Sequence, residues 1–214
     1  MSKNYLFFDL DGTLTNSMSG IFAGLRYAFK KCGVEDRPDE ELKKYIGPPL
    51  MFSFVNYTGM SEELACKALA AYREFYRETG VHMNTLYTGI ADMIKALHKA
   101  GKKLYVASSK PEEQVRIIIE ENGLSEYFEF IGGATLDKSR ADKISVLRYV
   151  IENAGAPPVE ECVMIGDRLY DAEGADYFGM DCIGVLWGFA EDGEFDRFAN
   201  TKTVKTPDEL LLIV

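Results

Sequence analysis

Short, nearly continuous apolar runs alternate with helix-like patterns along most of the 214-residue chain. Continuous apolar runs of this length are typical of strands in a parallel sheet that is buried on both faces. Their alternation with helices predicts an α/β fold, in which a doubly wound parallel sheet is flanked by helices. The expected strands are 4–9, 103–108, 128–132, 162–167 and 182–186.

Two helices between these strands are indicated by apolar residues at the 3.6-residue period. The segment 89–100 has its apolar residues on one helical face and is followed by a glycine. The segment 139–154 is also followed by a glycine, and it places Ile144, Leu147 and Ile151 on its apolar face. Glycine after the last periodic residue is a common helix stop.

One interval is too long for a simple crossover. More than 90 residues separate the first two strands, whereas a plain βαβ unit needs only about 30. We therefore expect an inserted helical cap at 16–80 and an α/β core made of 1–15 and 81–214. Amphipathic patterns at 21–32 and 64–76 support helices in the insertion. Ligands of such folds bind beyond the carboxyl ends of the strands, where this cap would lie.

Charge, apolar runs and cysteine spacing argue against several classes of protein. The chain has 34 acidic and 24 basic residues, a net charge of −10, which argues against sequence-independent binding of nucleic acid. No apolar run approaches the ~18 residues of a membrane span, and the N-terminus has no signal-peptide pattern. The four cysteines have no CxxC spacing, so we expect reduced thiols in a cytoplasmic protein.

Asp9 and Asp11 follow the first apolar run, in the sequence DLDGT. Residues two apart in an extended chain point to the same side, so we expect the two carboxylates to converge. They would repel each other unless a metal lay between them or one held a proton. Gly12 would allow close approach of a ligand. A calcium loop is the alternative, but its twelfth position, which needs an acid, is Gly20.

Two more acids, Asp167 and Asp171, follow the fourth apolar run. Taken alone, Asp171 could be an ordinary helix cap. Since the carboxyl ends of parallel strands meet at one sheet edge, however, these acids would join Asp9 and Asp11 there. Ligand sets made only of oxygen suit Mg²⁺.

Ser108 and Lys143 are candidate anion-binding residues. Ser108 ends the second strand just before a helix that starts at Pro111 or Glu112, so its hydroxyl and the helix N–H groups could bind a phosphate. Lys143 lies in the first turn of a helix, where the helix dipole disfavours a cation. Neutralising a bound phosphate would explain that position. Lys110 and Lys138 could compete for this role, and a helix cap and a solvated lysine are the structural alternatives.

Together these motifs resemble those of the haloacid dehalogenase-like hydrolase superfamily. The match comprises DLDGT, the SSK of the second strand, a lysine that opens a later helix, and GDxxxD after the fourth strand. The position of the insertion is similar to that of a type-one helical cap. The segments LTNSMSGI (14–21), IGPPL (46–50) and IGVLWG (183–188) look most like the phosphoglycolate-phosphatase-like branch and the bacterial 5′-nucleotidases near it.

The resemblance implies a role for each motif residue. Asp9 would be the nucleophile and Asp11 the general acid/base. The phosphate-binding residues would be Gly12, Ser108, Ser109 and Lys143. Mg²⁺ would be held by Asp9, Asp167, the backbone carbonyl of Asp11, and Asp171 directly or through water.

The function implied is Mg²⁺-dependent hydrolysis of a small soluble phosphate monoester through an aspartyl-phosphate, with phosphoglycolate or a nucleoside monophosphate as first guesses. The alternatives are a sugar-phosphate mutase-type phosphoryl transferase of the same superfamily and a non-enzymatic receiver-like module that accepts phosphate on an Asp. We expect no nucleic-acid or membrane partner.

Two further features have open interpretations. Trp187 could wall the site or pack in the core. The acidic tract Glu191–Glu194 is expected to be a solvated loop.

Overall fold

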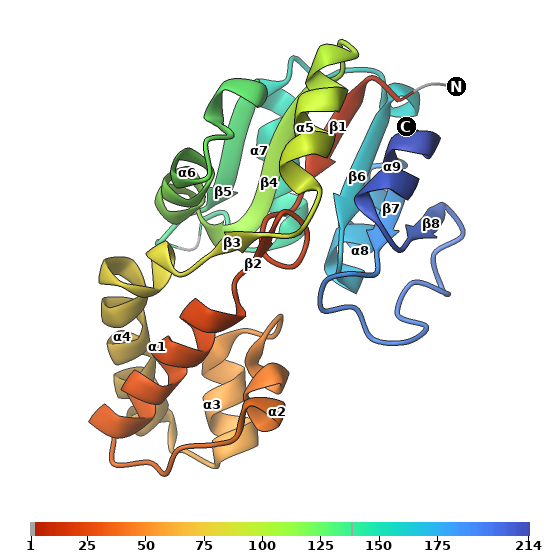
Figure 1. Ribbon diagram of the computed structural model, residues 1–214. Helices are drawn as coiled ribbons and strands as arrows, with labels where there is room; N and C mark the ends of the chain where they lie inside the picture. Colours follow the sequence, from red (N-terminus) through yellow and green to blue (C-terminus); the bar gives the residue numbers. More distant parts are fainter. Residues whose placement is uncertain (1–2, 138) are drawn as a thin grey trace. The chain divides into compact units, whose positions relative to one another are not determined.

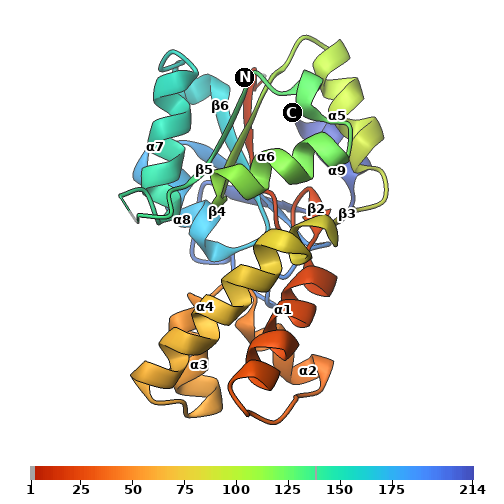
Figure 2. The ribbon, with the colours of Figure 1, turned by 90° about the vertical axis from the view of Figure 1, so that its left-hand side faces the viewer.

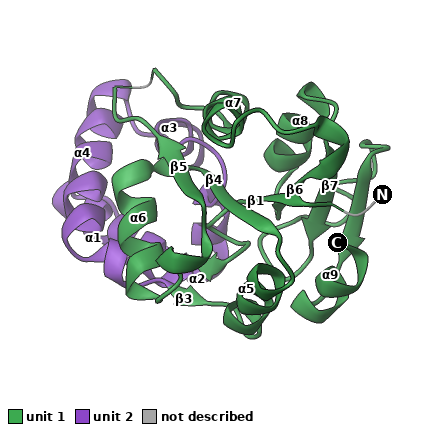
Figure 3. Ribbon diagram, turned by 90° about the horizontal axis from the view of Figure 1, so that it is seen from above, with its two compact units in different colours: residues 1–16, 85–214 green, residues 17–84 purple. Residues whose placement is uncertain are grey.

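The computed structural model describes residues 3–137 and 139–214; the candidate Lys138 lies outside them. The chain forms two compact units (Figure 3). The first comprises the described residues up to Asn16 together with Thr85–Val214, and the second is Ser17–Asn84.

The first unit contains a six-stranded parallel sheet in the order β5-β4-β1-β6-β7-β8 (Figure 1). The doubly wound α/β fold expected from the sequence is therefore confirmed. The strands are β1 (Tyr5–Phe8), β4 (Lys103–Pro111), β5 (Phe130–Ala134), β6 (Cys162–Gly166), β7 (Asp181–Val185) and β8 (Thr201–Val204).

The edge strand β8 was not predicted, because Thr201–Val204 is short and mostly polar and its middle two residues are exposed. The third expected strand, 128–132, lies two residues later in the structure, at Phe130–Ala134. The second runs on to Pro111, and its pairing with β5 shifts register between Ser108 and Pro111.

Helices cover both faces of this sheet (Figure 3). One face carries α7 and α8, and the other carries α5, α6 and α9. Their bounds are α5 (Ile90–Lys99), α6 (Glu112–Glu121), α7 (Lys143–Asn153), α8 (Leu169–Tyr177) and α9 (Pro207–Ile213). Short 3₁₀ turns span Ser125–Tyr127 and Val159–Glu161.

The buried face of α7 differs from the expected one. Val146, Leu147 and Val150 are buried, whereas Ile144 and Ile151 are only partly covered. The helix also begins at Lys143, later than predicted, because Asp142 caps it: the Asp142 carboxylate accepts a hydrogen bond from Ser145 N–H at 2.8 Å.

The strand order determines where a site can form. β1 is central, the chain continues from it to β4 and β5 on one side, and it then returns to β6 on the other. At the end of β1, Phe8 pairs with Val106 of β4 and with Ile165 of β6. A ligand site of an α/β sheet lies at such a switch point, beyond the carboxyl ends of the strands.

The second unit is helical. It consists of α1 (Met18–Lys31), α2 (Asp39–Leu42), α3 (Leu50–Thr58) and α4 (Glu62–Glu78), with 3₁₀ turns at Lys43–Tyr45 and Gly80–His82. α1 and α4 pack side by side (Figures 1 and 2). Ser61 caps α4, since its side chain accepts a hydrogen bond from Leu64 N–H at 3.3 Å. Leu25, Phe29 and Phe54 are fully buried in the core of this unit.

The two connections to the helical unit pair with each other. β2 (Thr15–Asn16) and β3 (Thr85–Leu86) form an antiparallel ribbon in which Asn16 lies opposite Thr85. The chain therefore leaves the α/β unit and re-enters it through adjacent backbone.

Two observations bear on the expectations from composition. No helix in the described part of the chain has both the length and the apolar character needed to cross a membrane. All four cysteines are free thiols, and Cys162 and Cys182 are buried.

Candidate active site

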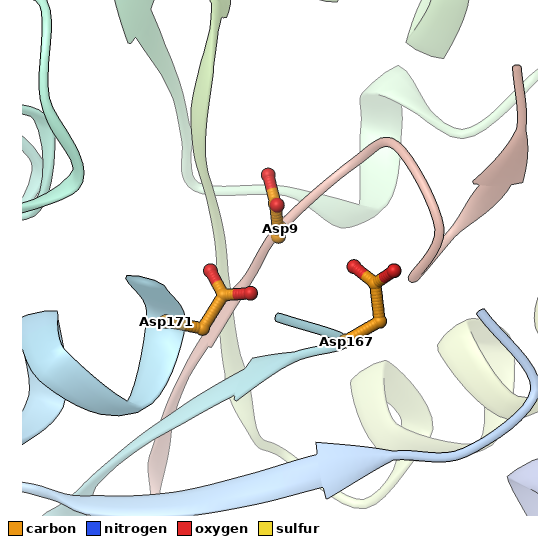
Figure 4. Close-up of side chains that lie close together, drawn as sticks. All are labelled: Asp9, Asp167 and Asp171. Carbon is orange, nitrogen blue, oxygen red and sulfur yellow. The ribbon is translucent and has the colours of Figure 1, made fainter. Parts of the chain in front are cut away.

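Three carboxylates meet at the carboxyl edge of the sheet. Asp9 follows β1, Asp167 follows β6, and Asp171 lies in the first turn of α8. One oxygen from each lies within 4.8 Å of the other two, and the three side chains lie close together (Figure 4). Asp167 and Asp171 are fully buried. Three acids at this distance repel strongly unless cations lie among them.

Lys143 supplies one such cation. Its ammonium Nζ lies 3.0 Å from Asp9 Oδ1 and 2.8 Å from Asp171 Oδ1, and it donates a hydrogen bond to the carbonyl of Ala107 at 2.9 Å. Burial lowers the pKa of Lys143, but the charges of Asp171 and Asp9 outweigh burial and raise the pKa above its usual value. The carboxylates thus explain why a lysine occupies the unfavourable first turn of α7.

Asp167 has polar partners of a different kind. The hydroxyl of Thr13 donates to Oδ1 at 3.3 Å, and the backbone N–H of Phe189 donates to Oδ2 at 2.8 Å. Burial and the nearby charges of Asp171 and Asp9 raise the pKa of Asp167 well above its usual value. Burial also raises the pKa of Asp171, to about 6.

These three acids fit a divalent metal ion. One ammonium cannot neutralise three carboxylates, and no salt bridge to Asp167 occurs among the described residues. The clustered donors are all oxygens, the type that Mg²⁺ prefers. The raised pKa of Asp167 reflects a buried negative charge that a cation at this position would offset.

Gly12 makes room for Asp167. Its φ is +83°, a conformation that side-chain-bearing residues rarely adopt, and a Cβ atom there would lie 2.0 Å from Asp167 Oδ2. Glycine is therefore required both by the backbone conformation and by the close approach of the carboxylate.

The carboxylate of Asp11 is not part of the three-acid group and has its own partner. Lys110 Nζ lies 2.8 Å from each of its two oxygens. The regular strand ends at Phe8, and Asp11 instead forms an isolated bridge with Thr15. The alternation on which the expected convergence of Asp9 and Asp11 was based therefore does not extend to Asp11.

The two serines after β4 differ in environment. Ser108 is buried, and its Oγ accepts a hydrogen bond from the backbone N–H of Lys110 at 3.4 Å. Ser109 is exposed, and in the described part of the chain it makes no hydrogen bond to the other candidate residues. Their roles in phosphate binding remain predictions.

Comparison with known proteins identifies the family. A family model described as haloacid dehalogenase-like hydrolase matches residues 6–185. This chain belongs to that family. The relatives named below include several phosphatases, and the protein is an enzyme of the phosphatase type.

Three curated relatives have informative names. A 5′-nucleotidase of Pseudomonas aeruginosa is 38% identical over 88% of this chain and 85% of its own. The tyrosine-protein kinase PtkA of Mycobacterium tuberculosis is 37% identical over 98% of this chain and 72% of its own. A phosphoglycolate phosphatase of Vibrio vulnificus is 28% identical over 85% of this chain and 83% of its own.

Solved structures agree with the fold. The structure of a predicted phosphatase from Clostridium acetobutylicum superposes with a TM-score of 0.90 at 36% identity, covering 99% of this chain and 98% of the other. A haloacid dehalogenase-like hydrolase from Streptococcus pneumoniae gives a TM-score of 0.89 at 27% identity, covering 98% and 97%.

Several contacts at the site were not foreseen from the sequence. The Thr13 hydroxyl and the Phe189 N–H both hold Asp167, and Trp187 Nε1 donates to the Thr13 carbonyl at 3.0 Å. The segment IGVLWG, which contains the end of the buried strand β7 and continues into Trp187 and Gly188, was the available signal. It indicated a loop beside the site but not which backbone groups face the acids.

Proposed function

We propose that the protein hydrolyses the phosphate monoester of a small soluble molecule, with Mg²⁺ and through a phosphorylated Asp9. The supporting observation is the group of three carboxylates, Asp9, Asp167 and Asp171, with the Lys143 ammonium between two of them. These three acids and the backbone carbonyl of Asp11 would hold the ion. Mg²⁺ bound there would offset the negative charge of the phosphate and of the acids.

In the first half of the reaction, a carboxylate oxygen of Asp9 attacks phosphorus and the bond from phosphorus to the ester oxygen breaks. Asp11, protonated at this stage, donates its proton to the leaving oxygen, so that an alcohol departs. Lys143, which already lies beside Asp9, offsets the charge that develops on the phosphoryl group. Gly12, Ser108 and Ser109 would supply hydrogen-bond donors to the phosphoryl oxygens.

In the second half, water attacks the phosphorus of the phosphorylated Asp9. Asp11, now deprotonated, accepts the proton from that water. The bond between Asp9 and phosphorus breaks, which releases inorganic phosphate and restores the carboxylate. Asp11 returns to its protonated form, so the cycle closes without any other reactant.

Sequence identity to the named relatives suggests an order for testing the substrate candidates. The 5′-nucleotidase is 38% identical to this chain and the phosphoglycolate phosphatase 28%. We therefore place a nucleoside monophosphate before phosphoglycolate. We further propose that the helical unit Ser17–Asn84 acts as the cap expected from the sequence and contributes residues that select the leaving group.

A second candidate is phosphoryl transfer to a tyrosine hydroxyl, favoured by the 37% identity to a protein named tyrosine-protein kinase over 98% of this chain. A hydroxyl group would then accept the phosphoryl group in place of water. The mutase-type alternative differs in the same way, with a sugar hydroxyl as acceptor. The family match favours all of these enzymes over the receiver-like module.

A phosphate-release screen tests the proposal. In one set of reactions, the purified chain is incubated with Mg²⁺ and a nucleoside monophosphate, phosphoglycolate or a sugar phosphate. In a separate reaction, it is incubated with Mg²⁺, ATP and a tyrosine-containing peptide. Release of phosphate from a nucleotide, absent in Asp9→Asn, is the expected result. Labelling of the peptide without release of phosphate would favour the second candidate, and neither activity in any arm would overturn both.

A further inference from the structure

The loop after β7 contains a carboxylate that does not behave as its sequence suggests. The acidic tract Glu191–Glu194 was expected to be solvated. Glu191 is exposed, but the side chain of Glu194 is only 5% exposed. The expectation is wrong for Glu194, because this residue meets a set of donors that the sequence alone does not reveal.

Glu194 joins its own loop to the start of α8. Its Oε1 lies 2.9 Å from Arg168 Nε and accepts a hydrogen bond from Leu169 N–H at 2.7 Å. Its Oε2 accepts from Glu191 N–H at 2.7 Å. Burial opposes ionisation of this carboxyl, but the two backbone N–H groups and Arg168 outweigh burial and lower the pKa of Glu194.

The other end of the same loop is attached to Asp167, one of the three clustered acids, and to Thr13. Phe189 N–H donates to Asp167 Oδ2 at 2.8 Å, and Trp187 Nε1–H donates to the Thr13 carbonyl at 3.0 Å. Gly188 lies close to both Gly12 and Asp167, since a Cβ atom on Gly188 would lie 2.2 Å from the Gly12 carbonyl oxygen and 2.6 Å from Asp167 Oδ2.

The loop is therefore attached to two adjacent points of the chain, at Asp167 and at the residues that directly follow it. One attachment is to the Asp167 carboxylate itself, and the other is to the next residue, Arg168. Between the two attachments lie only Ala190–Gly193. A change at Glu194 would therefore be transmitted over a short segment to the N–H group that orients the carboxylate.

We propose that Glu194 is a positioning residue, which holds the loop against α8 so that Phe189 N–H keeps the Asp167 carboxylate aimed at Asp9 and Asp171. Glu194 is not one of the residues proposed to hold Mg²⁺ or phosphate, and in this proposal it acts only through the hydrogen bond from Phe189 N–H to Asp167. The inference rests on the proposed function, in which Asp167 binds Mg²⁺. Outer partners of metal ligands are known to change metal affinity by about 10–100-fold when removed.

The test compares Glu194→Gln with Glu191→Gln, an exposed acid of the same loop. Four quantities are measured below the unfolding temperatures of all variants. They are Mn²⁺ binding to the metal-free protein, the Mg²⁺ concentration for half-maximal activity, kcat at saturating Mg²⁺, and the rate of amide hydrogen exchange at Phe189. Glu194→Gln should weaken metal binding about tenfold, speed exchange at Phe189 and change kcat little. Glu191→Gln should behave as the wild type.

Wild-type metal affinity in folded Glu194→Gln would overturn the proposal, and so would a loss of thermal stability alone. If Glu194→Gln does not fold, Glu194→Asp replaces it. That variant keeps the charge but shortens the side chain, so a smaller loss of metal affinity is expected and an unchanged affinity overturns the inference. Failure of the proposed function is visible separately, because the wild type would then bind no metal.

Discussion

The ammonium of Lys110 lies 2.8 Å from both carboxylate oxygens of Asp11. The lysine side chain is 6% exposed and that of Asp11 is 25% exposed, so this ion pair is partly shielded from water. Asp11 is the proposed acid/base, and Lys110 thus fixes the orientation of the group that must reach the leaving oxygen.

Replacing Lys110 should affect substrates according to their leaving groups. In Lys110→Met, Asp11 loses its orienting partner, and turnover of an alkyl phosphate should fall about 10²-fold, the lower end of what general acid–base catalysis contributes. Turnover of p-nitrophenyl phosphate should fall much less, because its leaving group hardly needs a proton. Lys103→Met, which removes an exposed lysine of the same strand paired with Glu129, is the control. Equal losses on both esters would contradict this role.

Substitutions of Asp9 and Asp11 should separate nucleophile from acid/base. Asp9→Asn removes the attacking oxygen and a charged metal ligand, so both turnover and Mg²⁺ affinity should fall. Asp11→Asn keeps the backbone carbonyl, so metal binding should survive while turnover of an alkyl ester falls about 10²–10⁴-fold. Steady-state rates measure the turnover of both variants, and Mg²⁺ titrations measure their metal affinity. If Asp11→Asn turned over the alkyl ester at the wild-type rate, Asp11 would not be the general acid/base but only a structural residue of the turn.

Removal of the metal should abolish activity and lower stability. With EDTA, the buried carboxylates lose the cation proposed for them, and phosphate release should stop. Adding Mg²⁺ at 100 times its Kd should stabilise the fold by about 2.7 kcal/mol, which raises Tm by several degrees. Ca²⁺ should support little turnover, because it takes about 6–8 ligands and can occupy both oxygens of Asp9. Full turnover in EDTA by metal-free protein would exclude the metal mechanism.

Gly12 and Gly33 offer a matched pair of substitutions. Both have a positive φ, but a Cβ atom at Gly33 meets nothing within 4 Å, whereas one at Gly12 meets Asp167 Oδ2 at 2.0 Å. Gly33→Ala should cost only backbone strain, about 1–3 kcal/mol, and leave activity intact. Gly12→Ala should also displace the carboxylate and lower kcat about 10²-fold. Thermal melts and rates of both variants check this, and an active Gly12→Ala would show that the carboxylate tolerates the shift.

The edge of the sheet where the acids gather could be predicted from the sequence. Asp9 and Asp167 follow apolar runs, and parallel strands bring their carboxyl ends together. The partner of Asp11 could not be predicted, because it depends on the irregular end of β4, where pairing shifts register between Ser108 and Pro111.

Glu194 shows a different limit of sequence patterns. Acidic residues in a Gly-containing tract are usually solvated, and only the fold reveals that two backbone N–H groups and Arg168 converge on this one carboxylate. The buried face of α7 was misjudged for a related reason. The apolar residues Ile144, Val146, Leu147, Val150 and Ile151 cover more than one face of the helix, and only its packing on the sheet selects those that become buried.

The antiparallel pairing of Asn16 with Thr85 has a consequence for how such enzymes can diversify. Because the inserted helices begin and end at neighbouring backbone positions, they occupy the same place in the α/β unit as the loop between the two strands of a β-hairpin. An insertion of another length or topology could begin and end at the same two residues without altering any backbone hydrogen bond of the six-stranded sheet. With substrate choice assigned to the helical unit, as proposed above, chemistry and substrate choice could then evolve in separate stretches of one gene, because the chain passes from one to the other through the two-residue strands β2 and β3.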